Sequence, residues 1–192
     1  MNLSIISWVI YDIGNTLFNA GVTGLFFPLW IVTKLNGTDA TVGYTLSLAL
    51  LVSLLISPIV GALSDQTNKR RLFLGIFTFI CGISTTFIGN NSIVISLIYY
   101  GISVTCLHVG DIFYNSMLKD VSHKNNIGII GGIGAGVGYL GAIIAILIGL
   151  FIIENNGYPV GFVIIGIFII LFGIPILIFL NEKPQQIQNR YI

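Results

Sequence analysis

Six long apolar segments make up almost the whole chain and limit what it can fold into. Turn residues and charges separate segments of about 19 to 27 residues, and about 20 apolar residues are enough for a helix to cross a bilayer. A soluble domain needs a charged surface, yet only 8% of the 192 residues are charged, against about 25% in soluble domains. The sequence therefore predicts an all-α membrane protein, with helices at about 7–33, 41–63, 71–89, 92–118, 127–153 and 159–180.

The Lys and Arg residues lie almost entirely on one side of these segments. Lys34 is on one side, and the other seven of the eight are on the opposite side: Lys69, Arg70, Arg71, Lys119, Lys124, Lys183 and Arg190. Because loops rich in Lys and Arg remain in the cytoplasm, an even number of helices puts both termini there. We expect a six-helix bundle over residues 1–181, followed by a polar cytoplasmic tail, 182–192.

The composition argues against several other classes of protein. A net charge of +1 argues against nucleic acid as a partner, since phosphate binding needs clustered Lys and Arg. Cys81 and Cys106 lie in apolar segments without a CxxC neighbour, which indicates buried thiols and no disulfide framework or metal site. Residues 136–141 (GVGYLG) match the dinucleotide fingerprint, but inside an apolar span with no preceding strand. We therefore expect no cofactor and no metal, and the lipid bilayer as the surroundings.

Two apolar segments each carry a stripe of polar residues. In the first segment all of them fall within about 60° of Asp12 on one helix face, and in the fourth within about 60° of His108. The two stripes are Asp12, Asn15, Thr16, Asn19 and Thr23, and Thr105, His108, Asp111, Asn115 and Lys119. Ionisable groups inside a membrane usually mark a functional pathway, so the stripes predict two walls of one wet cavity.

These polar residues also have plainer interpretations. Asp12 and Asp111 could sit at the membrane interface, because residues 13–33 and 91–110 could span on their own. The Asn and Thr side chains could simply bond neighbouring helices. His108 could carry protons or stay neutral on a backbone carbonyl. A metal pair or an intramembrane enzyme at His108 and Asp111 lacks a third ligand and a nucleophile–base pair, so we do not predict an enzyme.

The fifth segment is rich in glycine. Gly128, Gly132 and Gly136 recur every four residues, as do Gly134, Gly138 and Ala142, and Gly141 follows. Such faces let another helix approach closely. The sequence predicts a helix-packing interface at Gly132, Gly134, Gly136, Gly138 and Gly141, either within the bundle or against a second unit.

The connection between the second and third segments resembles a known signature. Residues 61–71 (GALSDQTNKRR) are similar to the cytoplasmic loop motif of the major facilitator superfamily, a Gly-x-Leu-x-Asp followed by a basic cluster. Asn68 stands where the family usually has Gly, and Asn also tolerates the left-handed turn conformation. The resemblance implies a gating role on the cytoplasmic side for Gly61, Asp65, Lys69, Arg70 and Arg71.

Three further stretches resemble one branch of that superfamily, the vacuole effluxer-like or autophagy-related amino-acid effluxers and their prokaryotic relatives. They are residues 11–18 (YDIGNTLF), 113–118 (FYNSML) and 138–141 (GYLG). The branch usually has Trp and Ala where this chain has Ile13 and Gly14, and the helix-4 arginine of many family antiporters is absent. Family members normally have twelve helices, so the resemblance covers only the N-terminal half.

The resemblance implies a half-size secondary transporter of a small polar solute, with amino-acid efflux as the suggested activity. Solute or coupling protons would contact Asp12, Asn15, Asn19, His108, Asp111 and Asn115. Six helices cannot enclose the usual pathway, so the chain would act as a homodimer or with a separate C-terminal half. The host membrane would be a prokaryotic plasma membrane or a vacuolar-type membrane. The alternative is a truncated or split carrier, or an accessory subunit, without transport of its own.

Overall fold

The computed structural model describes residues 3–67, 69–90, 92–122, 125–180 and 182. Every regular element among them is a helix. Positions 183–192 of the expected tail lie outside the described residues, and with them Lys183 and Arg190 of the predicted charge asymmetry. Lys124, which also counted towards that asymmetry, and Asn68 of the loop motif lie outside them as well.

The first rod of the fold is continuous but changes its winding. It consists of α1 (Leu3–Leu17), the π-helical segment η1 (Phe18–Phe26) and α2 (Phe27–Lys34). In η1 the hydrogen bonds reach five residues back, as from the Phe27 N–H to the Val22 oxygen. Pro28, which has no N–H to donate, lies in the first turn of α2. Wide turns of this kind are frequent at functional sites.

Four further rods follow in up-and-down order. They are α3 (Asp39–Thr67), α4 (Arg70–Thr86), α5 (Ile93–Val121) and a segmented rod of α6 (Ile127–Gly138), α7 (Leu140–Ile148), η2 (Gly149–Ile153) and α8 (Glu154–Asn156). The last helix, α9, spans Tyr158–Phe179. The turn before α3 uses Asn36 at φ 53°, and the turn before α9 uses Gly157 at φ 84°, a conformation that glycine adopts without cost.

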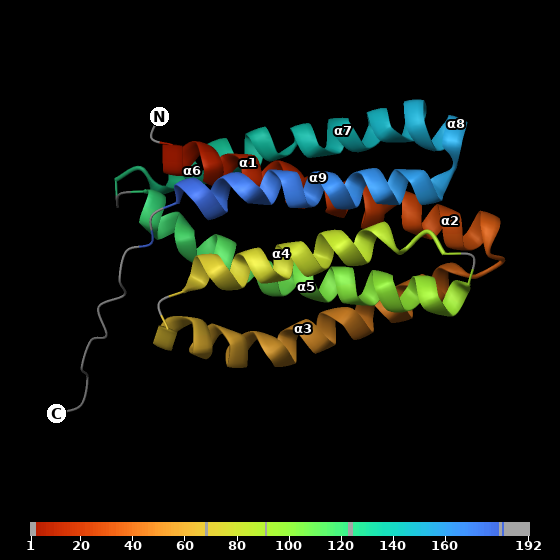
Figure 1. The fold of residues 1–192 in the computed structure, drawn as a ribbon, viewed down its shortest axis with the longest axis horizontal. Helices are drawn as coiled ribbons and strands as arrows, with labels where there is room; N and C mark the ends of the chain where they lie inside the picture. Colours follow the sequence, from red (N-terminus) through yellow and green to blue (C-terminus); the bar gives the residue numbers. More distant parts are fainter. Residues whose placement is uncertain (1–2, 68, 91, 123–124, 181, 183–192) are drawn as a thin grey trace.

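The rods lie side by side with alternating direction (Figure 1). The start of α1, the α3–α4 and α5–α6 connections and the end of α9 gather at one end of the bundle. We call this the basic end, because Lys69, Arg70 and Arg71 lie there. Lys34 is at the opposite end, with the α4–α5 connection (Figure 1).

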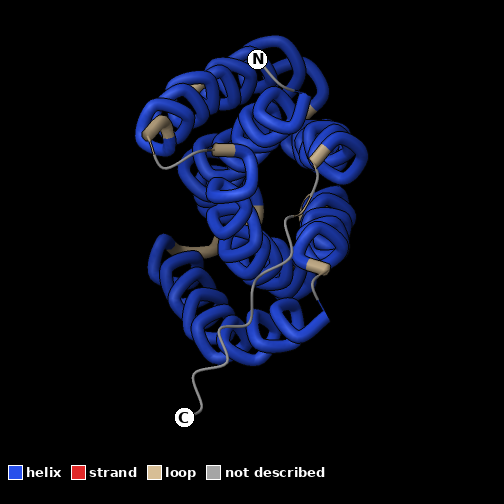
Figure 2. The backbone as a smooth tube through the Cα atoms, turned by 90° about the vertical axis from the view of Figure 1, so that its left-hand side faces the viewer, coloured by secondary structure: helices blue, strands red, loops and turns tan. Residues whose placement is uncertain are grey.

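The helices are unequally covered by their neighbours. Helix α9 packs between α1 and α4, and α5 packs against both α4 and α3. Seen along the bundle (Figure 2), α3 lies at one margin and the α6–α8 rod at the other. Only 11% of the most apolar 18-residue stretch of α3 is buried inside the bundle, whereas 44% of the corresponding stretch is buried in the first rod and in α5. Helix α3 therefore exposes most of its apolar surface.

Within the part of the chain that the structure describes, five helices are long and apolar enough to cross a membrane: 3–34, 39–67, 93–121, 127–156 and 158–179. Helix α4 has 17 residues, at the lower limit of about 17 for a span. It is nevertheless held inside the bundle, where a Cβ on Gly82 would lie 2.8 Å from the Gly166 oxygen of α9. The all-helical membrane fold agrees with the sequence, whereas the expected span at 71–89 is not one of these five helices.

Candidate functional site

The two polar stripes meet at one hydrogen bond. The Asn15 Nδ2 on α1 donates to the Asp111 Oδ1 on α5 over 2.8 Å, across 96 positions of sequence. Asp111 lies ten residues before the end of α5 at Val121, about 15 Å along the helix from the basic end. This polar contact therefore lies inside the bundle, about a third of the way along the 29 residues of α5 from the basic end.

His108 faces the same carboxylate from one turn earlier on α5. Its Nδ1 lies 3.7 Å from the Asp111 Oδ2, too long for a hydrogen bond, so the two interact as an ion pair only when the imidazole is protonated. The exposed fractions of the two side chains are 36% for His108 and 23% for Asp111. Both side chains are therefore accessible from outside the bundle.

Two more stripe residues extend the site along α1 and α5. Asn19, on η1, donates to the Asn15 backbone oxygen over 3.1 Å and is exposed. Asn115 is exposed on α5, one turn beyond Asp111. Asn15, Asn19, His108 and Asp111 are thus brought together, and Asn115 prolongs their exposed face towards the basic end.

Asp12 has a different neighbour from the one its stripe suggests. Its carboxylate lies against Gly138 at the end of α6, so closely that a Cβ on this glycine would collide with it. The same Cβ would lie 3.2 Å from the Thr16 Oγ1. Asp12 therefore faces the α6–α7 junction, beside the Asn15–Asp111 pair on α1.

An aromatic cluster beneath the polar stripe ties α1 to α5 and was missed at the sequence level. Tyr114 stacks on Trp8 at a ring-centroid distance of 4.5 Å and on Tyr11 at 4.9 Å. The Trp8 Nε1 donates to the Tyr114 backbone oxygen over 3.1 Å, and the Tyr11 and Thr78 hydroxyls are 3.1 Å apart. Tyr11 and Tyr114 lie in two of the resemblance motifs, but their stacking depends on how the helices are rotated.

An apolar groove adjoins the polar site on the open face of α5. It lies between α3 and α5, has a volume of about 490 Å³ and is lined by Thr45, Leu48, Ala49, Val52, Val94, Leu97, Ile98, Gly101, Ile102, Thr105 and Cys106. Thr105 joins the two helices, because its hydroxyl donates to the Ala49 backbone oxygen over 3.2 Å. It is also one turn from His108 on the same helix, so one stripe residue lines the groove, whereas His108 and Asp111 do not.

The expected gating residues do not all pair with one another. Arg70 bonds the Asp120 carboxylate of α5 over 2.8 Å, with side-chain exposures of 5% and 7%. Asp65 and Lys69 are exposed, and Gly61 has no atom of another element within 4 Å of an added Cβ. Asp120 was not foreseen, because its partner is 50 positions away and no local pattern marks such a pair.

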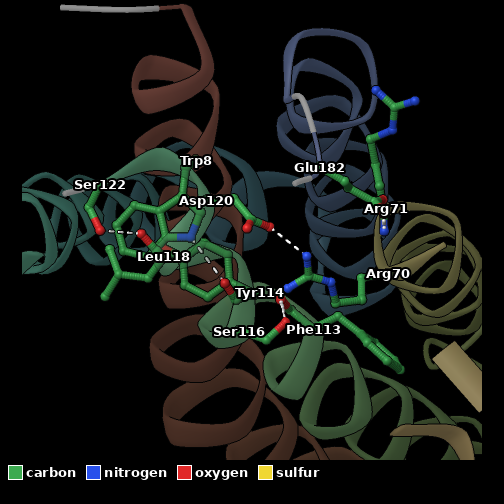
Figure 3. A network of polar contacts seen from close by, with 10 residues as sticks. All are labelled: Trp8, Arg70, Arg71, Phe113, Tyr114, Ser116, Leu118, Asp120, Ser122 and Glu182. Atoms are coloured by element: carbon green, nitrogen blue, oxygen red, sulfur yellow. Dashed lines mark hydrogen bonds and ion pairs between the residues drawn. The ribbon is translucent and has the colours of Figure 1, made fainter. Parts of the chain in front are cut away.

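Arg71 points the other way, towards the end of α9. Its guanidinium donates to the Leu180 backbone oxygen over 2.8 Å, and its backbone N–H donates to the Glu182 carboxylate. Figure 3 shows the contact between Arg71 and Glu182 beside the Arg70–Asp120 pair and the Trp8–Tyr114 stack. The basic end therefore ties α4 to α5 through one arginine and α4 to the segment after α9 through the next.

The glycine-rich rod has two distinct faces. Gly134, Gly138 and Gly141 are buried against α1, where a Cβ would collide with the Trp8 ring, with the Asp12 carboxylate and with the Ile13 backbone oxygen respectively. Gly132 and Gly136 are exposed, with nothing within 4 Å of an added Cβ, and so is Gly128. The first face packs within the bundle, and the second remains open.

No group of three or more His, Cys, Asp or Glu side chains is placed to hold a metal ion among the described residues. Cys81 and Cys106 are both buried free thiols. The chemistry that the polar site offers is therefore hydrogen bonding and charge, from carboxylates, amides and an imidazole.

Comparison with known proteins gives one matching family model and two relatives that we describe here. The model of the Major Facilitator Superfamily matches residues 14–190. A Bacillus subtilis (strain 168) protein named as the uncharacterized MFS-type transporter YxiO is 27% identical over 158 residues, which cover 77% of this chain and 37% of that protein. A protein of Aquifex aeolicus (strain VF5), named only as uncharacterized, is 25% identical over 182 residues, covering 94% of this chain and 46% of that protein. No solved structure matches significantly.

The chain spans less than half the length of these two curated relatives. The superfamily expected from residues 61–71 is confirmed by a match that includes nearly the whole sequence. The apolar helices agree with it. This chain belongs to the Major Facilitator Superfamily, and it is a multi-pass integral membrane protein of a transporter family.

Proposed function

We propose that the chain forms one half of a secondary carrier that moves a small polar solute by alternating access. The observation that carries this proposal is the 2.8 Å bond between Asn15 and Asp111. It joins the polar stripes of two apolar helices inside the bundle, and ionisable groups within apolar membrane helices usually mark a solute or proton pathway. The solute, or a coupling proton, would bind at Asp12, Asn15, Asn19, His108, Asp111 and Asn115.

The proposed topology has six spans. Helix α4 would be the sixth, because it lies alongside α5 and α9 and can cross a thinned or locally adapted bilayer. The basic end, with Lys69, Arg70, Arg71 and Lys119, would then face the cytoplasm. Both chain termini would lie on that side.

A second half would complete the pathway. The two halves of this fold are related by an axis along the membrane normal, so a parallel homodimer is geometrically allowed, as is a separate C-terminal half. The exposed apolar surface of α3 and the open glycine face of α6 support such an interface. We propose that these two faces meet the other half.

The basic end would govern closure of the cytoplasmic side. The buried Arg70–Asp120 pair fixes the start of α4 against α5, and the Arg71 contacts fix it against the end of α9. Asp65 and Lys69 are exposed and Gly61 is partly buried at the end of α3 or near it, and all three would contact the other half when that side closes.

Amino acids are the proposed solute class, and efflux is the proposed direction. This part of the proposal comes from the resemblance of residues 11–18, 113–118 and 138–141 to the vacuole effluxer-like branch. The carboxylates, amides and imidazole of the site suit the polar groups of an amino acid.

Counterflow into proteoliposomes tests the proposal. The purified chain is reconstituted with an unlabelled amino-acid mixture inside, and entry of labelled amino acids is measured. Asp111→Asn should reduce counterflow at least about tenfold, because a hydrogen bond to a charged group contributes about 1.5–3 kcal/mol. Glu154→Gln, at an exposed position of α8, is the control and should transport normally. Unchanged counterflow in Asp111→Asn would refute the site.

A second candidate is a carrier fragment or accessory subunit without transport of its own. This candidate is supported by the length of the match, because the chain covers only 37% and 46% of the two relatives. Cross-linking and native electrophoresis of the full chain separate the two. Monomers without counterflow would indicate the fragment, whereas dimers with counterflow would indicate the half-carrier.

A further inference from the structure

A second groove lies between α4 and α9 at the basic end of the bundle. It has a volume of about 500 Å³ and is lined by Arg71, Leu72, Gly75, Ile76, Phe79 and Leu177. All of these residues except Leu177 come from one face of α4, where they extend over about 12 Å of the helix. Half of the hydrocarbon core of a bilayer is about 15 Å thick, so the length of the groove suits a chain that lies within one leaflet.

The walls of this groove are apolar and open. Leu72, Ile76 and Phe79 are exposed by 46% to 55%. The floor is formed where α9 approaches α4, because a Cβ on Gly75 would lie 2.9 Å from the Leu177 Cδ2. Since lipid tails are about as apolar as leucine, these walls suit an acyl chain.

Arg71 adds a positive charge at the basic end of the groove. Its guanidinium donates to the Leu180 backbone oxygen over 2.8 Å, which holds the group beside the end of α9. This bond uses a single N–H of a planar group that has several, and such a fork matches the oxygens of a phosphate. Figure 3 shows the Arg71 side chain extending away from Arg70, which is paired with Asp120. The second arginine therefore stays available to an anion at the groove.

The charges at the two ends of the bundle differ in balance. Among the described residues, the basic end carries Lys69, Arg70, Arg71 and Lys119 with Asp65, Asp120 and Glu182, and the opposite end carries Lys34 with Asp39 and Glu154. The Glu182 carboxylate accepts the backbone N–H of Arg71, so part of its charge is used at the start of α4. Basic pockets between helices on the cytoplasmic side are typical binding sites for anionic lipid headgroups.

We propose that an anionic phospholipid binds in the α4–α9 groove, with its phosphate on Arg71 and an acyl chain along Leu72, Ile76 and Phe79. The proposal goes beyond the proposed function, because it requires a membrane-embedded chain and does not require transport. The bound lipid would bridge α4 and α9, which Arg71 already joins through the Leu180 oxygen. It would leave free the faces of α3 and α6 that we assign to the second half.

Three matched probes test the lipid on the full chain in detergent, with native mass spectrometry as the readout. They are dioleoyl phosphatidylglycerol, dioleoyl phosphatidylcholine and glycerophosphoglycerol, which is the headgroup of the first without its acyl chains. Phosphatidylglycerol should bind at least about tenfold more tightly than phosphatidylcholine, because the choline group cancels the charge that attracts the phosphate to Arg71. Glycerophosphoglycerol should bind more weakly still, because it buries no apolar chain.

Two results with these probes would overturn the proposal. Equal affinity for the two phospholipids would remove the anionic headgroup. Binding of glycerophosphoglycerol as tight as that of phosphatidylglycerol would mean a site for a soluble phosphate, without a role for the groove.

Charge variants locate the headgroup. Arg71→Gln should weaken phosphatidylglycerol at least about tenfold. Lys119→Gln removes the same charge at an exposed position of the basic end outside the groove, and it should bind as the wild type does. Glu182→Gln should bind at least as tightly as the wild type, because a carboxylate beside the phosphate is removed. Equal losses in Arg71→Gln and Lys119→Gln would mean a general attraction to the basic end and would overturn the site.

A second pair of variants locates the acyl chain. Ile76→Trp should fill the groove and weaken phosphatidylglycerol, whereas Ile83→Trp, at an exposed position of the same helix that does not line the groove, should not. Unchanged affinity in both Arg71→Gln and Ile76→Trp would overturn the proposal. Dimers without bound phospholipid would assign the groove to a second copy of the chain and overturn it too. The wild-type probe series decides the question even where a variant fails to fold.

Discussion

At the scale of single residues, the molecule contains two carboxylates with very different partners. Asp111 is partly exposed and bonded to a neutral amide, so its second carboxylate oxygen can still contact a solute. Asp120 is almost fully enclosed with Arg70, so its charge is used within the chain. One α5 carboxylate thus lies at the proposed solute site, and the other, nine positions later, pairs within the bundle.

Breaking the Arg70–Asp120 pair from either side should destabilise the protein. Arg70→Gln and Asp120→Asn should each cost about 1.5–3 kcal/mol, because each removes a buried hydrogen bond between two charged groups. The measurement is the fraction of monodisperse protein left after heating in detergent. The double variant should lose much less than the sum of the two single variants. An additive loss would mean that the two side chains do not act as a pair.

Helical periodicity was enough to predict which polar residues share a face. It grouped Asn15 with Asn19, and His108 with Asp111, because both pairs lie within about 60° on one helix. The Asn15–Asp111 bond, the Arg70–Asp120 pair and the turn of Asp12 towards Gly138 could not be predicted this way. They depend on the rotation of one helix against another, which no local spacing specifies.

At the scale of helices, the glycines of α6 and α7 determine how close α1 can come. The helix bounds differ from the expected ones by at most four residues, since apolar length and turn residues set them. The π-helical segment η1 was not expected, although Gly21, Gly24 and Pro28 lie in or beside it. The winding of a helix depends on its tertiary packing as well as on its composition.

The two glycine faces should respond oppositely to an added methyl group. Gly141→Ala should destabilise the protein by about 1–3 kcal/mol, because the methyl would collide with the backbone of α1, which cannot yield. Gly136→Ala has open space and should be neutral or stabilising by up to about 1 kcal/mol. Thermal unfolding in detergent compares them. Equal losses would mean that α1 does not pack against this rod.

At the scale of the whole molecule, two exposed surfaces are candidates for an interface with the proposed second half. Helix α3 buries little of its apolar surface, and α6 leaves Gly128, Gly132 and Gly136 open. If two copies pair around an axis along the membrane normal, α3 of one copy would meet α6 of the other.

Disulfide trapping tests this pairing. Two differently tagged copies are co-expressed without native cysteines, one with Leu55→Cys on α3 and one with Gly136→Cys on α6, both at exposed positions. Mild oxidation in membranes should give a mixed dimer, and Phe79→Cys on α4 in place of Leu55→Cys should not. Monomers only, from both combinations, would contradict the homodimer.

The most direct test is whether water reaches the polar face of the first rod. Asn19 and Phe79 are both exposed near the middle of their rods, on the polar face of the first rod and on α4 respectively. Single cysteines at these positions, with Cys81 and Cys106 changed to Ala, are treated in open membranes with a charged, membrane-impermeant methanethiosulfonate. The account predicts rapid labelling of Asn19→Cys and none of Phe79→Cys, because water reaches a cavity but not a lipid-facing surface. An Asn19→Cys as unreactive as Phe79→Cys would contradict it.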